Sequence, residues 1–505
     1  MKKKRIFLLG FGVLAALVLA AIIPVALFFT AGLRTPARPA SPDYWPTHGW
    51  KTTSPEAQGF DSAGLAQGLL SLHEKGQPID GLMIIRNGYV VVDAHFAPYD
   101  GTFPHDLASV TKSVTTTLIA IAAEQGYLDL DKPVVAYFPD RTIANLDEHK
   151  ARLTVRHLVE MRNGMKSECY DGDEPTLDAM RSQPDWVQAA LDRPMVAEPG
   201  TENCYDSPGM HILSAILQET TGMTELDFAR KNLFAPLGIQ EVIWEVDPQG
   251  YTRGWGDLHL LPEDAAKIGF LWLQRGNWDG QQIVPEAWVL DSVRMHSRFV
   301  KGDIGYGYGW WICGQDYHAS GRGGQAVRVF ASRNTILVIT GNYYEFSAIE
   351  KWLYPALIGL KNTRPADPQG QAALASALAD IGEEDKVASA SPSAELVQSI
   401  SGRTYQCDSN LLKVETASLL LDDPAVAKLS AGTNGIDSTW SIGLDGRYRQ
   451  APTGEAYRGY WLDPQTFQYD KFDIGVLHQQ VHFEGDRLQV RIPELEMNIN
   501  CQTQD

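Results

Sequence analysis

The chain has 505 residues, enough for about three folded units at roughly 150 residues each. Hydrophobic residues make up 44% and charged residues 21%, which excludes a wholly disordered chain, a collagen-like repeat and a simple coiled coil. The net charge of −19 repels nucleic-acid phosphates and anionic headgroups, so a nucleic-acid binder and a peripheral membrane binder are excluded as well.

The N-terminal region has the pattern of a membrane anchor. Four basic residues at positions 2–5 precede an uncharged apolar run at 6–33, which is longer than the roughly 20 residues needed to cross a bilayer. Residues 1–33 are therefore predicted to be an uncleaved transmembrane signal anchor rather than a long cleaved signal peptide. This predicts a single-pass protein of the inner (cytoplasmic) membrane, with the rest of the chain on the periplasmic side. The Pro-rich residues 34–45 are predicted to be an extended tether.

Residues 46–360 are predicted to form one mixed unit in which strands flank a helical middle. Residues 81–96 contain two strands joined by an Asn-Gly turn, and residues 109–125 form a buried helix closed by Gly126. This order predicts a sheet covered by helices. Further helices are expected at 178–192, 209–222 and 262–276, and further strands at 305–314, 321–332 and 334–344.

The remainder of the chain changes in composition twice. Residues 361–395 are rich in Ala, Ser, Pro and acidic residues, which predicts a linker with one short helix. Residues 396–505 alternate polar with apolar or aromatic residues between Asp-Gly and Gly-Asp turns. This pattern predicts a separate C-terminal all-β domain, either a small antiparallel sheet or a barrel.

Three motifs in chain order carry the chemistry. Ser109 and Lys112 form an S-x-x-K pair at the start of an apolar helix, where residues three apart lie on one face. A serine hydroxyl needs such a neighbouring base before it attacks a carbonyl. Alone, the pair also fits an ordinary capped helix. The stretch Tyr205-Asp206-Ser207 follows it, and Ala319-Ser320-Gly321-Arg322 begins a later strand.

With their surroundings, these motifs resemble the serine β-lactamase and penicillin-binding protein superfamily. Over residues 46–360 the chain is most similar to class C β-lactamase-like hydrolases, including esterases and 6-aminohexanoate-dimer hydrolases. The supporting stretches are GYLDLDKPVVAYFPD, LTVRHLVEMRNGM and YGYGWWI. The resemblance implies an α/β fold of the α+β type, with an antiparallel sheet flanked by helices and a helical subdomain. A class A enzyme is excluded because no E-x-x-L-N segment is present.

The resemblance implies a role for each motif residue. Ser109 corresponds to the nucleophile, Lys112 to its proton acceptor or electrostatic partner, and Tyr205 to the general base for acylation and deacylation. The backbone N–H groups of Ser109 and Arg322 correspond to the oxyanion hole, in which one donor is typically worth 10²–10³ in rate. The residues implied to bind substrate are Ser207, Ser320, Gly321 and Arg322.

Two departures from the family pattern bear on the substrate. Ser207 stands where many members have Asn, and Ala319 stands where they have Lys or His, the group that holds a β-lactam carboxylate. The resemblance therefore implies a hydrolase that cleaves an amide or ester through a Ser109 acyl-enzyme, with weak or no β-lactamase activity. Two alternatives remain: a peptidoglycan-directed D,D-carboxypeptidase or endopeptidase, and a non-catalytic ligand-binding or sensor protein.

The remaining polar and aromatic residues are given structural roles. His157 and His211 are predicted to pack inside helices, and the aromatic pair Trp310 and Trp311 to pack within a strand rather than form a substrate platform. The histidines have no metal-ligand spacing, so neither a metal nor another cofactor is predicted. The expected partner is a small amide, ester or peptide substrate, with no nucleic acid, and the oligomeric state is left open.

The five cysteines show no C-x-x-C spacing. Cys407 and Cys501 lie in the first and last predicted strands of the C-terminal domain, which become neighbours if that domain closes, so a Cys407–Cys501 disulfide is predicted. A Cys169–Cys204 disulfide is the second expectation, because both residues lie in loops that precede or enter the Tyr205 segment. Cys313 would then be a free, buried thiol.

Overall fold

The computed structural model describes residues 39, 41–169, 174–298, 304–314, 316–384, 389–433 and 435–503. Within this part of the chain no helix is both long enough and apolar enough to cross a membrane. The predicted location as a single-pass protein of the inner membrane is therefore contradicted. The apolar segment 6–33, on which that prediction rested, lies outside the described residues.

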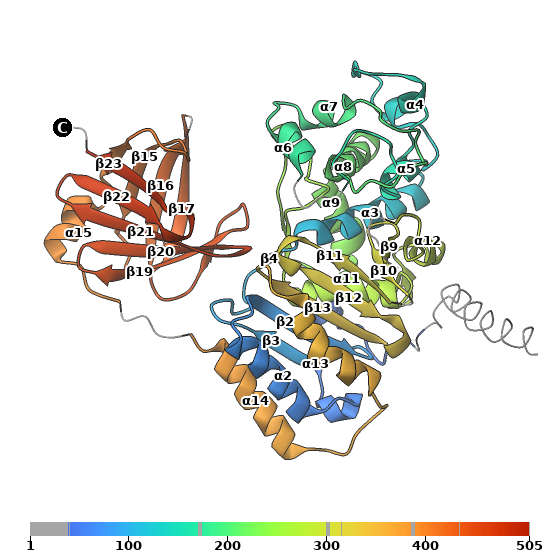
Figure 1. Ribbon diagram of the computed structural model, residues 1–505, viewed down its shortest axis with the longest axis horizontal. Helices are drawn as coiled ribbons and strands as arrows, with labels where there is room; N and C mark the ends of the chain where they lie inside the picture. Colours follow the sequence, from blue (N-terminus) through green and yellow to red (C-terminus); the bar gives the residue numbers. More distant parts are fainter. Residues whose placement is uncertain are drawn as a thin grey trace, which may run out of the picture.

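The main unit is built on an eight-stranded sheet (Figure 1). The first pairing, of β1 with β3, is parallel, and every other pairing is antiparallel. In spatial order the strands are β1 (Lys51–Thr52), β3 (Tyr89–His95), β2 (Ile79–Arg86), β13 (Thr335–Gly341), β12 (Ala326–Phe330), β11 (Asp316–Ser320), β10 (Trp311–Cys313) and β9 (Ile304–Tyr306).

Both faces of this sheet are buried under hydrophobic cores. Successive side chains of a strand point to opposite faces, so one strand contributes to both cores. On β2, Met83 and Ile85 join one hydrophobic core, whereas Leu82 and Ile84 join a second core on the other face. Helix α11 (Pro262–Leu273) packs on the first face. Helices α2 (Ser62–Glu74), α13 (Phe346–Ile358) and α14 (Pro368–Gly382) contribute to the second core.

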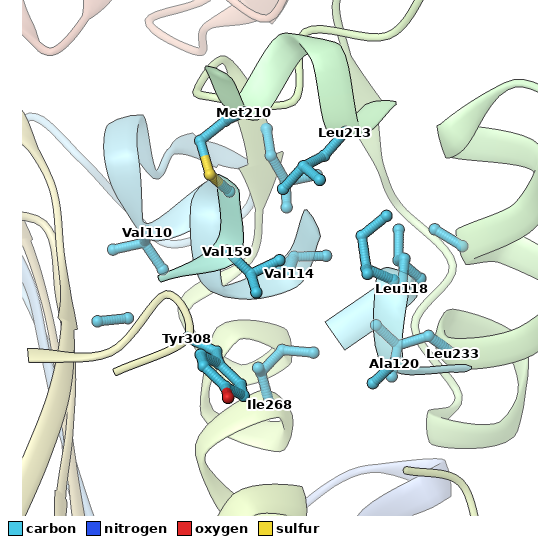
Figure 2. Packing of buried hydrophobic residues seen from close by; sticks show 14 of the residues in the cluster. Val110, Val114, Leu118, Ala120, Val159, Met210, Leu213, Leu233, Ile268 and Tyr308 are labelled. Atoms are coloured by element: carbon cyan, nitrogen blue, oxygen red, sulfur yellow. The ribbon is translucent and has the colours of Figure 1, made fainter. Parts of the chain in front are cut away.

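A helical subdomain lies beside the sheet and contains α3 (Thr111–Glu124) at its centre (Figure 1). Every residue of α3 from Thr111 to Ala122 is buried, as the apolar sequence predicts. Figure 2 shows Val114 and Leu118 of α3 among Met210 and Leu213 of α8 (Ser207–Thr221). The other helices here are α4 (Glu148–Ala151), α5 (Val155–Val159), α6 (Pro175–Arg181), α7 (Trp186–Leu191), α9 (Glu225–Ala229), α10 (Ala235–Leu237) and α12 (Glu286–Ser292).

Short strands complete the main unit. A three-stranded sheet contains β4 (His105–Asp106), β6 (Leu258–Leu260) and β5 (Ile243–Trp244), and β7 (Asn277–Trp278) pairs with β8 (Gln281–Gln282). The pairing of β4 with β6 places the residues just before Ser109 against the loop that ends at Leu258. This arrangement matches the α/β architecture that the resemblance implied.

The segment that was expected to be a linker contains a long helix. Helix α14 has 15 residues and buries Leu374, Ala377 and Ile381, which lie three and four residues apart on one face against α2. The small side chains of this segment permit that close packing, whereas its composition alone read as a spacer. The short helix α15 (Ala394–Ile400) follows and leads into the C-terminal domain.

The C-terminal domain is a closed β-barrel, as predicted, in which every strand pairing is antiparallel except the parallel one that closes the ring. The strands are β14 (Thr404–Cys407), β15 (Val414–Leu420), β16 (Val426–Thr433), β17 (Ile436–Gly443), β18 (Arg449–Gln450), β19 (Ala456–Asp463), β20 (Thr466–Asp473), β21 (Gly475–Glu484), β22 (Arg487–Ile492) and β23 (Met497–Gln502). Nine of them run in the order β17-β16-β15-β14-β23-β22-β21-β20-β19, and a pairing of Gly443 with Arg458 closes the ring. Strand β18 pairs on β19. Closure removes the exposed strand edges that an open sheet would present.

The barrel rests on the main unit through a small aromatic cluster, at the point where the two meet in Figure 1. Tyr99 and Phe103 of the main unit pack against Phe472 and Ala456 of the barrel, and the Tyr99 and Phe472 rings stack with centroids 5.6 Å apart. Gln450 also donates a hydrogen bond to the Pro104 carbonyl oxygen at 2.9 Å. The residues just upstream of Ser109 are therefore held from the barrel side.

The structure contains both disulfides that the sequence analysis proposed. Cys407 pairs with Cys501 on the adjacent strands β14 and β23, and Cys169 pairs with Cys204. Cys313 is a free thiol, but it is exposed rather than buried. It is the last residue of β10 (Trp311–Cys313), whose first two residues are buried, so its exposure comes with the end of the strand.

Candidate active site

Ser109 and Lys112 lie on consecutive turns at the start of the central helix. Ser109 lies on a short 3₁₀ turn (Ala108–Val110), and Lys112 lies in the first turn of α3. The Lys112 Nζ donates to Ser109 Oγ at 2.7 Å and to the Trp255 carbonyl oxygen at 3.0 Å. Lys112 is completely buried, whereas Ser109 is half-buried. The half-buried Ser109 hydroxyl thus accepts a hydrogen bond from the side-chain nitrogen of Lys112, which solvent does not reach.

The turn that presents Ser109 has an unusual backbone. Ala108 has a φ of 45°, a left-handed conformation that costs a non-glycine residue free energy and persists only where its surroundings impose it. Asp106 accepts a hydrogen bond from the Ala108 N–H at 2.8 Å, and Thr111 Oγ1 donates to the Ala108 carbonyl oxygen at 2.6 Å. Burial raises the pKa of the Asp106 carboxyl to about 6. These contacts fix Ser109 at the top of a strained turn.

The third motif lies directly against this turn. A Cβ atom on Gly321 would be 2.6 Å from the Leu107 carbonyl oxygen and 2.9 Å from the Ser109 backbone nitrogen, so only glycine fits there. The side chain of Gln325 ties the following bend to β13, because it donates to the Gly341 carbonyl oxygen at 2.6 Å and accepts from the Gly341 N–H at 3.1 Å. The backbone around Gly321 and Arg322 is therefore held next to the Ser109 amide.

Tyr205 comes to the same place from the loop before α8. It is buried, and the Lys112 Nζ lies over its ring, 4.7 Å from the ring centroid. Trp311 stacks on the same ring, with centroids 5.9 Å apart and ring planes 20° apart, and Tyr306 meets the ring edge-on at 6.0 Å. A cation beside an aromatic face at this distance is an attractive contact. Ser109 and Lys112 of the first motif and Tyr205 of the second are thus in one cluster.

A buried ion pair anchors the tyrosine loop. The guanidinium of Arg193 donates to both carboxylate oxygens of Asp206, at 2.6 and 2.9 Å, and Asn163 donates to the same carboxylate at 2.7 Å. Asp206 is fully buried, so its charge depends on these partners. The Cys169–Cys204 disulfide ties the residue before Tyr205 to a second loop. Nothing in the sequence linked Arg193 or Asn163 to the motif, because their roles depend on tertiary packing.

Several residues implied to bind substrate have other surroundings. Ser207 is buried, and its hydroxyl donates to the Glu174 carboxylate at 2.7 Å, which leaves it engaged within the protein. Ala319 is buried in β11, Ser320 is half-buried at the end of that strand, and Arg322 is exposed. The backbone at Gly321 lies against the serine turn.

His157, His211 and Trp310 have the structural roles that were predicted for them. His157 accepts a hydrogen bond from the Thr154 N–H at 3.1 Å in a capping box, and His211 pairs with the buried Asp247 at 3.1 Å. Trp310 packs against Trp272 in the core, with ring centroids 5.2 Å apart. Trp311 differs, because it is the residue that stacks on Tyr205.

One neighbour of the site could not be found from motifs. The turn between β20 and β21 of the barrel reaches the bend after β11, where a Cβ on Gly323 would lie 2.5 Å from Ile474 Cγ2. The same turn contacts Asn342, since a Cβ on Gly475 would overlap the Asn342 side chain. The C-terminal domain therefore contributes Ile474 to the border of the site.

Known proteins resemble this chain in both sequence and fold. It is 24% identical over 261 residues to the 6-aminohexanoate-dimer hydrolase of Paenarthrobacter ureafaciens, covering 47% of this chain and 65% of that protein. It is 28% identical over 162 residues to the monacolin J acid methylbutanoyltransferase of Aspergillus terreus, covering 28% of this chain and 38% of that protein. The chain thus spans less than two thirds of the length of either relative.

The fold has its own counterpart. A solved Bacillus anthracis structure assigned as a 6-aminohexanoate-dimer hydrolase superposes with a TM-score of 0.51 at 18% identity, covering 64% of this chain and 88% of that one. The family model described as Beta-lactamase matches residues 64–359, more than half of the chain and the part that contains Ser109, Lys112 and Tyr205. On that match, the protein belongs to the β-lactamase family.

Proposed function

We propose that the protein is a serine hydrolase that cleaves a small amide or ester through an acyl-enzyme on Ser109. The observation that carries the proposal is the 2.7 Å contact between the buried Lys112 Nζ and the half-buried Ser109 Oγ, with Tyr205 packed beside the ammonium group. A serine hydroxyl held beside groups that can transfer its proton is the usual form of an activated serine nucleophile. The names of the relatives, a dimer hydrolase and an acyltransferase, belong to chemistries that share this intermediate.

In the proposed acylation, Tyr205 acts as the phenolate, so Ser109 Oγ attacks the substrate carbonyl carbon while its proton passes to the Tyr205 oxygen. The carbonyl oxygen becomes an oxyanion, which the Ser109 and Arg322 N–H groups receive. Tyr205 then returns the proton to the leaving amine or alcohol as the carbon–heteroatom bond breaks. Lys112 keeps Ser109 Oγ in place and provides positive charge beside the tyrosine. In deacylation, water takes the place of the leaving group and the proton moves by the same route.

The proposed substrate is small and need not carry a carboxylate next to the scissile bond. Ala319 offers no charge to such a group, and the Ser207 hydroxyl is engaged by Glu174. A charge-assisted hydrogen bond is worth about 1.5–3 kcal/mol, or roughly ten- to a hundredfold in specificity. A β-lactam or a peptidoglycan stem peptide is accordingly expected to be a poor substrate. Hydrolysis of p-nitrophenyl butyrate requires neither a positive charge for a carboxylate nor a free hydroxyl at position 207.

The test begins with the identity of the nucleophile. A fluorophosphonate probe should label Ser109 in the full chain, and mass spectrometry of the peptides locates the adduct. Ser109→Ala should abolish both labelling and ester hydrolysis. Ser399→Ala is the matched control, because Ser399 is exposed on α15 and its hydroxyl donates only to the Leu396 carbonyl oxygen. Labelling of another serine, or unchanged hydrolysis in Ser109→Ala, would reject the proposal.

The second step separates chemistry from binding. Lys112→Ala and Tyr205→Phe should each lower kcat by about 10²–10⁴ with a much smaller change in KM, since general acid–base groups contribute in that range. Substrates of the rival functions are measured beside the ester: nitrocefin for a β-lactamase and a D-alanyl-D-alanine peptide for a carboxypeptidase. A kcat/KM for either that exceeds the value for p-nitrophenyl butyrate would reassign the substrate class.

A further inference from the structure

The C-terminal barrel is filled with side chains at one end. The inward-facing residues Tyr405, Ile442, Phe467 and Phe483 are at most 1% exposed. They cluster with Ile400 at the end of α15, which covers this end of the barrel before the chain enters β14. Large aromatic side chains leave no room there.

The opposite end is hollow. A cavity of about 200 Å³ lies between the strands there, and inward-facing residues such as Leu429, Trp440 and Val490 remain half-buried although they point into the barrel. Strand pairing joins Val490 and Ile499, through Val481, to Phe467, so they line the part of the cavity next to the packed end. Lys471, Gln479 and Ile492 line the part of the cavity nearer the opposite end. Small barrels are known to hold one small ligand in such a space.

The wall of the cavity is divided by polarity. Most of it is hydrocarbon from Leu, Val, Ile and Ala side chains, but β19, β20 and β21 contribute Tyr457, Tyr469, Lys471 and Gln479 side by side. Lys471 donates to Glu455 at 3.0 Å, so its charge is matched within the protein. A ligand with an apolar body and one uncharged hydrogen-bonding group would satisfy both parts of this wall.

The mouth of the cavity has exposed apolar residues. Leu412 lines the cavity and is 44% exposed, and its neighbour Leu411 is 88% exposed. Ile436, the first residue of β17, is 69% exposed, and the strand order places it at the same hollow end. Exposed apolar side chains around the mouth of an apolar cavity are typical of a binding site, because contact with them makes the binding of an apolar ligand more favourable.

We propose that the hollow end of the barrel binds one small, neutral amphiphile, of the size of a substituted benzene ring or a short branched acyl group. A dry apolar cavity of 150 Å³ accepts benzene, and this cavity is moderately larger. A long-chain lipid exceeds the space, and the Lys471–Glu455 pair offers no unmatched charge to an ionic head group. The site is separate from Ser109 and needs no catalytic step.

Benzyl alcohol and toluene are the matched probes, since they differ by one hydroxyl group. Ligand-observed NMR titration of the full chain should give saturable binding of both. Tyr457→Phe removes one hydroxyl from the polar wall, and it should weaken benzyl alcohol about five- to tenfold, the worth of one neutral hydrogen bond, while leaving toluene unchanged. Equal effects on the two probes would contradict the assignment of the polar wall.

Filling the cavity tests its position. Ala431→Phe directs a ring into the cavity from β16 and should abolish binding of both probes, whereas Ser430→Phe on the outer face of the same strand should not. Ala417→Leu fills the same space from β15 if the first variant fails to fold. Ester hydrolysis should be unchanged in all three. Absence of saturable binding in the wild type, or wild-type affinity in a folded cavity-filling variant, would overturn the proposal.

Discussion

Replacement of Glu225 by glutamine should change how the stability of the protein depends on pH. Glu225 is fully buried at the start of α9, and burial raises the pKa of its carboxyl to about 7. The nearby hydroxyls of Thr115 and Ser214 lower that pKa only in part, because they donate to the carbonyl oxygens of Gly254 and Thr252. The folded state therefore holds a protonated glutamic acid in slightly acidic solution.

The magnitude follows from the two pKa values. An exposed glutamate titrates near 4.3, and each pKa unit corresponds to about 1.4 kcal/mol, so the ionised form costs the folded state about 4 kcal/mol. Between the unfolded and folded pKa values the folded state binds more protons than the unfolded state. The contribution of Glu225 to the free energy of unfolding is therefore complete below about pH 4.3, falls as the pH rises, and is lost above about pH 7.

Urea denaturation at pH 5, 6, 7 and 8.5 measures this effect. Glu225→Gln cannot ionise, so its advantage in stability over the wild type should be only about 1 kcal/mol at pH 5 and should grow to about 4 kcal/mol at pH 8.5. Glu241→Gln is the control, because Glu241 is exposed. Parallel pH profiles for the wild type and Glu225→Gln would refute the reasoning, since they would show that this carboxyl titrates alike in both states.

Three further predictions concern the anchor of the Tyr205 loop, the barrel turn beside the site, and the two disulfides. Asp206→Asn removes the charge partner of the buried Arg193, which should destabilise the protein by about 3–5 kcal/mol and lower kcat more than it changes KM, because the Tyr205 loop loses its anchor. Thermal unfolding and ester kinetics are measured together, and an unchanged kcat for the folded fraction would count against the anchoring role. Ile474→Gly empties the contact with the bend after β11, so the preference among p-nitrophenyl esters of increasing acyl length should shift several-fold; an identical profile would show that the barrel turn does not border the acyl group. Opening the Cys169–Cys204 disulfide by substitution should cost about 2–4 kcal/mol and reduce ester turnover, whereas Cys407→Ser should destabilise the barrel with little effect on turnover, which separate denaturation and kinetic measurements can distinguish.

Those features that depend on neighbours along the chain could be predicted from the sequence. Ser109 and Lys112 lie three residues apart at a helix start, and helical geometry alone puts them on one face. The alternating pattern from residue 396 onward indicated a β-domain, and the position of Cys407 and Cys501 in its first and last strands follows from closure of that domain. The family resemblance was carried by the same local motifs, and the family match confirms it.

The other features were decided by the tertiary structure, because they join residues far apart in the chain. Composition marked the segment around α14 as a spacer, yet its small residues pack on α2, and Cys313 is exposed because its strand ends there. The family motif implied that Ser207 binds substrate, but in the folded protein its hydroxyl donates a hydrogen bond to Glu174 at 2.7 Å. The barrel turn with Ile474 reaches the bend after β11, next to an aromatic cluster that joins the two domains. Local spacing determines which residues share a helix or strand face, whereas packing between elements determines what each side chain meets.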